Sequence, residues 1–246
     1  MEHKLYYFQK GFNFSQDGPG NRLVYHLVGC NMRCPWCSNP EGMDVNREGR
    51  DITKVTAAEM LEEIRSCTPM FYDGGGVTFT GGEATMQIDT LKSILASLKC
   101  AGIHTVIETN GTSPRLPELL PLLDLLICDL KHTDSEKLRS VTGVSGENIY
   151  RNLRGAAEAE IPLLIRIPLI HGFNDDTASF DGFADFLSDL PADGFSVELL
   201  AYHEYGKDKW KKLGLPYTVE NGAIRESDRK CLAQRLCELG IRVITT

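Results

Sequence analysis

The chain has 246 residues, 42 % of them hydrophobic, and a formal net charge of -8 at pH 7. This length and composition are enough to bury the core of an α/β domain of barrel size. The acidic balance argues against a nucleic-acid partner, because proteins that bind nucleic acids usually present a basic face.

Short apolar, β-rich runs alternate with amphipathic helical stretches, which is typical of β-α units around a parallel sheet. The expected strands lie near residues 23–28, 77–80, 105–108, 125–130, 163–168, 196–200 and 242–245. Helices are expected at residues 57–66, 87–100, 180–190 and 226–239. No linker, repeat or low-complexity tract marks a boundary, so the pattern indicates a single domain over residues 1–246.

Several of the expected strands end in charged side chains. In the run ICDLK, Asp129 and Lys131 lie on one face of the strand and Cys128 on the other. Glu108 and Arg166 lie at or near the ends of two further strands. Any one of these could be an ordinary solvated strand end. Because catalytic groups of a parallel α/β barrel sit at the carboxyl ends of its strands, we expect them to converge on one mouth.

Three cysteines lie close together in the run GCNMRCPWCSN, which follows the first expected strand. They are Cys30, Cys34 and Cys37. Thiolates are the usual protein ligands of iron-sulfur clusters, and this spacing lets a short loop carry three sulfurs around one cubane. No fourth cysteine lies nearby, so one iron stays open to bind and activate a small molecule. The spacing therefore predicts a catalytic cluster.

Two other interpretations of these cysteines are structural zinc completed by a histidine, and disulfides in a secreted protein. No histidine lies within a few residues of the three, and no secretory or membrane-spanning run is visible. The remaining cysteines are scattered through apolar patterns, and we interpret them as buried thiols: Cys67, Cys100, Cys128, Cys231 and Cys237. We therefore expect a cluster in a cytoplasmic protein that does not associate with membranes.

The run VTFTGGEA places Gly81, Gly82 and Glu83 directly after the second expected strand. Glycines allow positive φ and let a ligand approach the backbone closely. Alone, this is a common strand-to-helix turn. Beside a cluster, exposed backbone groups and a carboxylate suit the ammonium end of an amino-acid-like ligand.

Together these motifs resemble the radical S-adenosylmethionine superfamily, whose hallmarks are the CxxxCxxC spacing and a following GGE-type motif. Further runs occur in the order found in its glycyl-radical-enzyme activating enzymes: DGPG at 17–20, ETNG at 108–111, DLK at 129–131, RIPLIHGFND around Arg166 and LLAYHEYGKDKW around His203. The resemblance covers nearly the whole chain and is strongest to the pyruvate formate-lyase activators. It implies a partial (β/α)6 TIM-like barrel of the radical SAM type.

The resemblance implies that the three cysteines bind one 4Fe-4S cluster whose open iron binds S-adenosyl-L-methionine. The cofactor positions that it implies are Trp36, Gly81, Gly82, Glu83, Asp129, Lys131, Arg166 and His203. Trp36 would lie beside the adenine, although simple packing of the loop is the alternative. The implied reaction is cleavage of S-adenosylmethionine by the reduced cluster, after which the 5'-deoxyadenosyl radical takes an α-hydrogen from a glycine of a partner such as pyruvate formate-lyase.

Two further sites rest on the same resemblance. Glu108, Thr109 and Asp129 match a region that binds a monovalent cation, although pyruvate formate-lyase activators have aspartate where this chain has Glu108. Asp17 matches the residue that meets the glycine loop of the partner enzyme. Its alternative role is to shape an Asp-Gly-Pro-Gly turn.

The resemblance also limits the subfamily and the partners. Residues 38–51 contain no cysteine, so the ferredoxin-like insert of many other activators is not expected, and Ser38 replaces a histidine of the pyruvate formate-lyase activators. The implied partners are a glycyl radical enzyme as protein substrate and flavodoxin or ferredoxin as electron donor, with the chain acting as a monomer. Two rivals remain: a radical SAM enzyme that acts on a small molecule, and a non-catalytic module that binds zinc.

Overall fold

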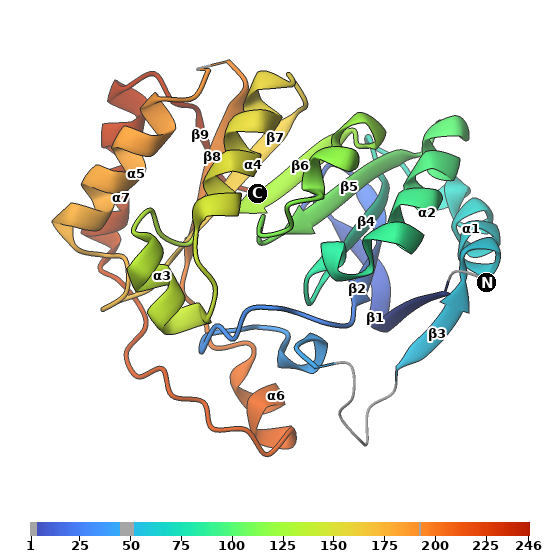
Figure 1. Cartoon of the computed structure of the whole chain (residues 1–246), viewed down its shortest axis with the longest axis horizontal. Helices are drawn as coiled ribbons and strands as arrows, with labels where there is room; N and C mark the ends of the chain where they lie inside the picture. The colour runs from blue at the N-terminus through green and yellow to red at the C-terminus, as the bar shows by residue number, and fades with distance from the viewer. Residues whose placement is uncertain (1–3, 45–51, 192) are drawn as a thin grey trace. The chain divides into compact units, whose positions relative to one another are not determined.

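The computed structural model describes residues 4–44, 52–191 and 193–246 (Figure 1). The chain divides into two compact units, which we describe separately. The first contains Met1–Asn31, Asn39–Thr109 and Ser113–Ile127, and the second contains Met32–Ser38, Asn110–Thr112 and Cys128–Thr246. A single domain over residues 1–246 therefore stays a prediction. Residues 45–51, part of the segment where no insert is expected, lie outside the described residues.

The sheet of the first unit has the strand order β3-β1-β2-β4-β5. Its strands are β1 (Lys4–Phe14), β2 (Asn21–Leu27), β3 (Thr53–Thr56), β4 (Gly76–Gly81) and β5 (His104–Thr109). The strands β2, β4 and β5 pair in parallel, as expected, whereas β1 pairs antiparallel with both β2 and β3. The sequence analysis missed β1 and β3. The second half of β1 is largely exposed, so its side chains do not alternate between a buried and an exposed face.

The helices of the first unit begin and end at local sequence signals. They are α1 (Ala57–Ser66) and α2 (Ile88–Cys100), with 3-10 turns at Pro40–Gly42, Thr68–Met70, Ala84–Gln87, Leu116–Glu118 and Leu120–Leu122. Thr56 and Glu59 form a capping box that satisfies free amide groups at the start of α1. The predicted bounds of α1 are confirmed, and α2 begins one residue later than predicted.

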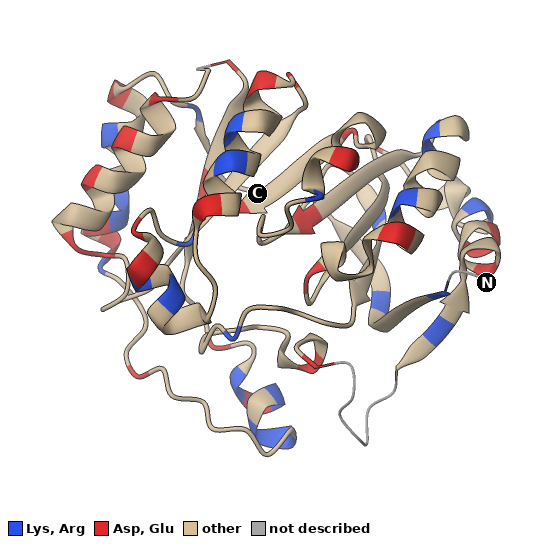
Figure 2. Ribbon diagram, in the orientation of Figure 1, with Lys and Arg blue, Asp and Glu red and all other residues tan. Residues whose placement is uncertain are grey.

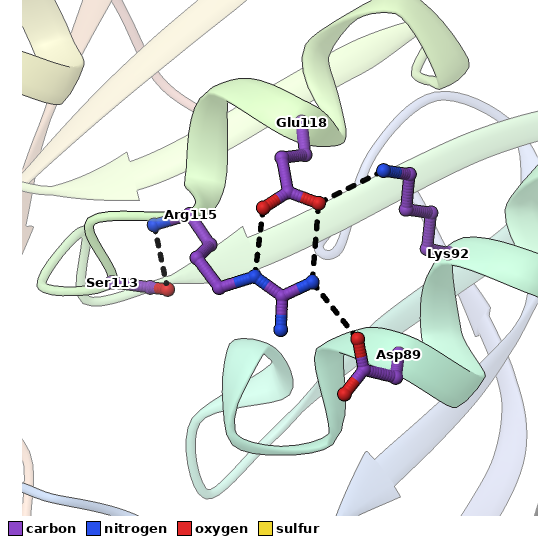
Figure 3. A network of polar contacts seen from close by, with 5 residues as sticks. All are labelled: Asp89, Lys92, Ser113, Arg115 and Glu118. Atoms are coloured by element: carbon purple, nitrogen blue, oxygen red, sulfur yellow. Dashed lines mark hydrogen bonds and ion pairs between the residues drawn. The ribbon is translucent and has the colours of Figure 1, made fainter.

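A surface ion-pair network joins α2 to the turn at Leu116–Glu118 (Figure 3). The Arg115 guanidinium donates to both carboxylate oxygens of Glu118, at 2.7 and 3.1 Å, and to Asp89 at 2.8 Å. Lys92 donates to the same Glu118 carboxylate at 2.8 Å. The hydrogen bonds from Arg115 and Lys92 lower the pKa of Glu118 to about 2. The network is solvated, and we assign it to the scaffold.

The second unit contains three parallel strands in the order β7-β8-β9, and β6 (Leu125–Asp129) ends where this unit begins. The strands are β7 (Leu163–Leu169), β8 (Phe195–Ala201) and β9 (Val243–Ile244). The helices are α3 (Ser135–Thr142), α4 (Glu147–Glu158), α5 (Thr177–Ser188), α6 (Lys207–Lys212) and α7 (Glu226–Glu238). Asp134 and Asp176 cap α3 and α5, and Gly143 ends α3 with a φ of 85° that favours glycine.

The burial of the scattered cysteines corrects one expectation. Cys128 is fully buried, but Cys67 is half-buried and Cys100, Cys231 and Cys237 are exposed. The three exposed thiols lie on α2 and α7, where an apolar helical pattern does not decide which residues face the core. The prediction of five buried thiols is therefore wrong for four of them.

Candidate functional site

The glycine-rich turn after β4 lies against the backbone that leads to Cys30. Gly82 N–H donates to the Leu27 carbonyl at 2.8 Å, and Glu83 N–H donates to the Gly29 carbonyl at 2.6 Å. Gly81 has a φ of 113°, and a Cβ at Gly82 would lie 2.2 Å from the Gly29 oxygen. Glycine is required at both positions because the turn packs on another segment of the backbone, and the close approach of a ligand stays a prediction.

The carboxylate of Glu83 is buried and held by donors from two segments. Its Oε1 atom accepts hydrogen bonds from the Thr85 amide at 2.9 Å, the Thr85 hydroxyl at 2.6 Å and the Thr109 hydroxyl at 2.7 Å. Only 1 % of Glu83 is exposed. The structure thus brings together two predicted site residues, Glu83 and Thr109, and adds Thr85, which sequence reasoning missed.

Glu108 lies near the end of β5 and accepts a hydrogen bond from the Thr80 hydroxyl of β4 at 2.8 Å. The next residue, Thr109, points to Glu83. A side-chain oxygen of Thr80 and a carboxylate of Glu108 therefore lie side by side in the first unit. These are hard oxygen donors of the kind that cations prefer.

The second and third cysteines lie on one turn of the second unit. Cys37 N–H donates to the Cys34 carbonyl at 3.2 Å, and the preceding Arg33 N–H donates to the Thr142 carbonyl at 2.9 Å. Burial raises the pKa of the Cys34 thiol, while the charge of Lys131 acts in the opposite direction. Burial is the larger of the two effects, so the surroundings favour the neutral thiol.

The segment around α6 fastens the end of this turn. The Trp210 indole Nε1–H donates to the Cys37 carbonyl at 2.8 Å, and Trp210 is 8 % exposed. A Cβ at Gly206 would lie 2.3 Å from the same carbonyl oxygen. Sequence reasoning missed both residues, although they belong to the run LLAYHEYGKDKW that was noted around His203.

The side chain of Trp36 packs against Phe173 with ring centroids 4.8 Å apart. Phe173 in turn meets the His132 ring edge-on at 5.2 Å. This contact packs the loop and leaves Trp36 half-buried. Burial lowers the pKa of His132, so this imidazole is held in its neutral form.

Asp129 and Lys131 form an ion pair that is shielded from solvent, with side chains 20 % and 11 % exposed. The carbonyl of Lys131 accepts a hydrogen bond from the Asn174 amide at 2.8 Å, and Asn174 also donates to the Pro168 carbonyl at 2.8 Å. This buried asparagine fixes the loop after β7 against the DLK segment. Sequence reasoning missed Asn174, although it lies within the noted run RIPLIHGFND.

Arg166 is paired with a carboxylate on the neighbouring strand. Its Nε donates to Glu198 Oε2 at 2.9 Å, and the two side chains are 7 % and 5 % exposed. The second oxygen of Glu198 accepts from the Thr246 amide at 2.8 Å and from the Thr246 hydroxyl at 2.6 Å. The sequence could have pointed to Glu198, because it is a lone acidic residue inside the apolar run FSVELLA and a buried charge needs a partner.

His203 lies outside any strand and is exposed. Its ring stacks on Tyr205 with centroids 4.2 Å apart, and Tyr205 itself is 80 % exposed. Partial burial lowers the pKa of His203. The imidazole is therefore uncharged at neutral pH and suited to stacking or hydrogen bonding rather than to binding an anion.

The turn that carries Asp17 is held by a buried arginine in the first unit. Asn13 donates to the Asp17 carboxylate, and the Thr78 hydroxyl donates to the Asp17 carbonyl at 2.7 Å. Arg22 donates to the Pro19 carbonyl at 2.6 Å and to Thr78 Oγ1 at 2.6 Å. Burial lowers the pKa of Arg22 to about 10. Sequence reasoning missed Arg22, which fixes the shape of the DGPG turn.

The residue types suit an iron-sulfur cluster by their chemistry: Cys30, Cys34 and Cys37 are thiols that form no disulfide in the described part of the chain. Within the ranges that the structure describes, no group of three or more histidine, cysteine, aspartate or glutamate side chains is arranged to hold a metal ion. The space beside Gly82 is occupied by the Gly29 and Gly42 carbonyl oxygens, so this glycine fixes the turn against the neighbouring backbone.

Comparison with known proteins decides the family. The family model described as the radical SAM superfamily matches residues 24–187. The chain belongs to the radical SAM superfamily. It is 36 % identical over 214 residues to a pyruvate formate-lyase-activating enzyme of Staphylococcus epidermidis, covering 83 % of this chain and 84 % of the relative. A pyruvate formate-lyase-activating enzyme of Staphylococcus aureus is 35 % identical over the same length.

Solved structures agree with this radical SAM assignment. The crystal structure of a domain of pyruvate-formate lyase-activating enzyme from Bacteroides vulgatus is 32 % identical, with a TM-score of 0.57, and covers 70 % of this chain and 98 % of that one. A radical SAM methyltransferase from Sphaerobacter thermophilus is 18 % identical with a TM-score of 0.67, covering 96 % of this chain and 68 % of that one. The predicted α/β fold of the radical SAM type is confirmed.

Membership of this superfamily makes the chain a radical SAM enzyme and implies a 4Fe-4S cluster and S-adenosylmethionine as cofactors. No helix among the described residues is long and apolar enough to cross a membrane.

Proposed function

We propose that the protein is a glycyl-radical-enzyme activase whose substrate is a glycine of a partner such as pyruvate formate-lyase. The observation that carries the proposal is the 36 % identity to a pyruvate formate-lyase-activating enzyme over 83 % of the chain. The packing of the GGE turn within the first unit supports it, as do the cysteine turn and the ion pairs of Arg166 and Lys131 within the second. We also propose a single-domain, monomeric, cytoplasmic protein.

The proposed ligands of the cluster are Cys30, Cys34 and Cys37, and the bound cluster would supply the electron that cleaves S-adenosylmethionine. This chain's own contribution is to orient and shield. Gly81 and Gly82 let the turn pack against the backbone that leads to Cys30, and the Glu83 carboxylate is the proposed acceptor for the ammonium group of S-adenosylmethionine.

The remaining proposed contacts separate by chemistry. The cationic side chains of Lys131 and Arg166 suit a carboxylate or ribose oxygens. The ring of Trp36 offers a face for the adenine, and His203 is a proposed contact for the methionine or ribose part of the cofactor. The oxygens of Glu108 and Thr109, with Asp129, are the proposed donors for a monovalent cation.

Two contacts outside the cofactor site complete the proposal. Asp17, on the turn held by Arg22, is the proposed contact for the glycine loop of the partner enzyme. Flavodoxin or ferredoxin is the proposed electron donor. Glycine suits the reaction because it lacks a side chain and its radical is stabilised by the flanking amides, so no acid-base pair is required.

The test is anaerobic reconstitution with iron and sulfide, followed by reduction with S-adenosylmethionine and a co-encoded glycyl radical enzyme. Electron paramagnetic resonance should show the doublet of a glycine radical, with 5'-deoxyadenosine formed in proportion. Cleavage of S-adenosylmethionine that depends on a small molecule, with no such doublet for any partner, would favour the small-molecule rival. Protein that binds zinc and contains no acid-labile sulfide would support the non-catalytic alternative.

Two cysteine variants sharpen this test. Cys34→Ala should abolish cleavage of S-adenosylmethionine, because it removes a proposed cluster ligand. Cys128→Ala should leave the iron and sulfide content unchanged, because this thiol lies beside Gly111 in the core of the second unit. Loss of the cluster from the Cys128→Ala variant would contradict the assignment of ligands.

A further inference from the structure

The short helix α6 carries a concentration of positive charge in an acidic protein. Its sequence, KDKWKK, places four lysines in six residues, whereas the whole chain has a net charge of -8. Figure 2 shows Lys and Arg gathered on α6. Lys207, Lys211 and Lys212 are exposed, and Lys207 is ion-paired with Glu204 at 2.8 Å.

The same helix is attached directly to the cysteine turn. Trp210 donates its indole N–H to the Cys37 carbonyl at 2.8 Å, and Gly206 packs so closely on this oxygen that a Cβ would lie 2.3 Å away. The Tyr217 ring meets the Trp210 ring edge-on, with centroids 5.8 Å apart. The Tyr217 and Tyr202 hydroxyl groups share a hydrogen bond of 2.9 Å. The buried side of α6 therefore contacts a proposed cluster ligand, and Lys207, Lys211 and Lys212 lie on the exposed side.

We propose that Tyr205, Lys207, Lys211 and Lys212, here called the lysine surface, form the docking site for an acidic one-electron carrier protein. The proposal rests on the proposed function, which requires an electron from outside the chain. Its argument is charge complementarity together with position. A lysine cluster on an otherwise acidic protein attracts an acidic partner locally, whereas the rest of the surface repels it. The partner is therefore steered to this one place.

Tyr205 suits the centre of such a surface. It is 80 % exposed, and its ring is already stacked on His203, so ordering it on binding costs little side-chain entropy. The transfer itself makes and breaks no covalent bond: the carrier loses one electron and is oxidised, and the bound cluster gains that electron and is reduced. The short path from the surface through Trp210 to the Cys37 backbone is the structural reason for placing the carrier here.

The test compares two double variants of equal charge. Lys211→Glu/Lys212→Glu reverses the lysine surface, and Arg225→Glu/Lys230→Glu makes the same change at the start of α7, where the side chains are 83 % and 74 % exposed. Reconstituted enzyme is mixed with reduced flavodoxin, and bleaching of the visible cluster absorption gives the rate of reduction. Calorimetry with oxidised flavodoxin gives the affinity independently of turnover.

We expect the α6 reversal to slow reduction by flavodoxin and to weaken its binding, each on the order of tenfold, at low ionic strength. The difference from the unmodified enzyme should shrink as salt screens the charges. The α7 control should match the unmodified enzyme. Reduction by photoreduced deazaflavin, which is uncharged and needs no docking site, should be equal in all three proteins.

Three results would overturn the proposal. Equal flavodoxin rates for the α6 variant and the α7 control would show that the lysine surface does not dock the carrier. An α6 variant that loses only glycine-radical formation under photoreduction would assign the surface to the glycyl radical enzyme. If the charge reversal unfolds α6, Lys211→Ala/Lys212→Ala should still slow flavodoxin reduction, and an unchanged rate would count against docking. Failure of the proposed function is distinguishable, since the unmodified enzyme would then form no glycine radical even under photoreduction.

Discussion

The two units hold their proposed cofactor residues by different means. In the first, Gly82 and Glu83 are fixed by backbone contact so close that it excludes a Cβ and by hydrogen bonds from hydroxyl and amide groups. In the second, Arg166 is held by a buried ion pair with Glu198. Close packing fixes position through repulsion, whereas an ion pair fixes it through compensated charge. The two arrangements should therefore fail differently when they are mutated.

Removing one partner of the buried ion pair should have the largest effect. Arg166→Met or Glu198→Gln leaves a buried charge without its counter-ion, which costs about 3–5 kcal/mol of unfolding free energy. The double variant Arg166→Met/Glu198→Met should lose much less than the sum of the two single variants. Denaturant unfolding followed by circular dichroism measures this, and additive losses would show that the pair is not coupled.

The same variants separate stability from binding. Arg166→Met should weaken binding of S-adenosylmethionine to the reconstituted enzyme, because it removes a proposed contact. Glu198→Gln should keep that contact while it destabilises the fold. Calorimetric titration with S-adenosylmethionine checks this, and equal affinities for the two variants would make Arg166 purely structural.

A Cβ at Gly82 should have the next largest effect. Gly82→Ala places a methyl group 2.2 Å from the Gly29 oxygen and 2.6 Å from the Gly42 oxygen, both backbone atoms. We expect a loss of about 2–3 kcal/mol in unfolding free energy, as for an overpacked core. Gly155→Ala is the matched control, because its Cβ meets nothing within 4 Å in α4 and should stabilise the protein by roughly 0.5–1 kcal/mol. A tolerated Gly82→Ala would mean that the turn can move.

Trp210→Phe tests how the second unit holds the cysteine turn. It removes the hydrogen bond to the Cys37 carbonyl and should cost about 1 kcal/mol. The cluster should also lose iron to a chelator faster than in the unmodified enzyme. Tyr217→Phe, which removes a hydroxyl hydrogen bond nearby but leaves Cys37 untouched, should retain iron normally. Equal iron loss from both variants would leave the Trp210 bond without a specific role.

The smallest expected effect is at the cap of α5 in the second unit. Hydrogen bonds from Ser179 lower the pKa of Asp176 to about 2, below the value of about 3.9 for an unfolded chain. The stabilisation is therefore complete above about pH 4 and is lost as the pH falls toward 2. Asp176→Asn keeps the cap and removes the charge, so it should cost roughly 0.3–1 kcal/mol at neutral pH. If the unmodified protein and Asp176→Asn differ by the same free energy of unfolding at pH 7 and at pH 2.5, the charge of Asp176 is not the cause.

The regular parts of the fold were readable from local patterns. The alternation of apolar runs predicted the parallel strands from β2 onward, and the capping box at Thr56 and Glu59 marks the start of α1 in the sequence itself. The antiparallel strands β1 and β3 were not found. Their stability comes from pairing with neighbours that lie far away in the sequence, and such pairing leaves little trace in the periodicity of an exposed strand.

The exposure of the scattered cysteines was misjudged for a related reason. Cys100 and Cys237 lie in the last turns of α2 and α7, where apolar neighbours suggested burial. A helix exposes part of its circumference whatever its composition, and its packing partner decides which part. Only Cys128, on a strand, is buried as predicted among the five.

By itself, the sequence determined the chemistry that this chain can perform. The spacing of Cys30, Cys34 and Cys37, with the GGE turn and the later motifs, indicated the family because ligand type and loop spacing are local properties. Only the tertiary structure showed that Glu198 neutralises Arg166, that Arg22 shapes the DGPG turn and that Trp210 holds Cys37. Each of these contacts joins residues on different segments, and burial gives a polar contact its strength because water no longer competes for it.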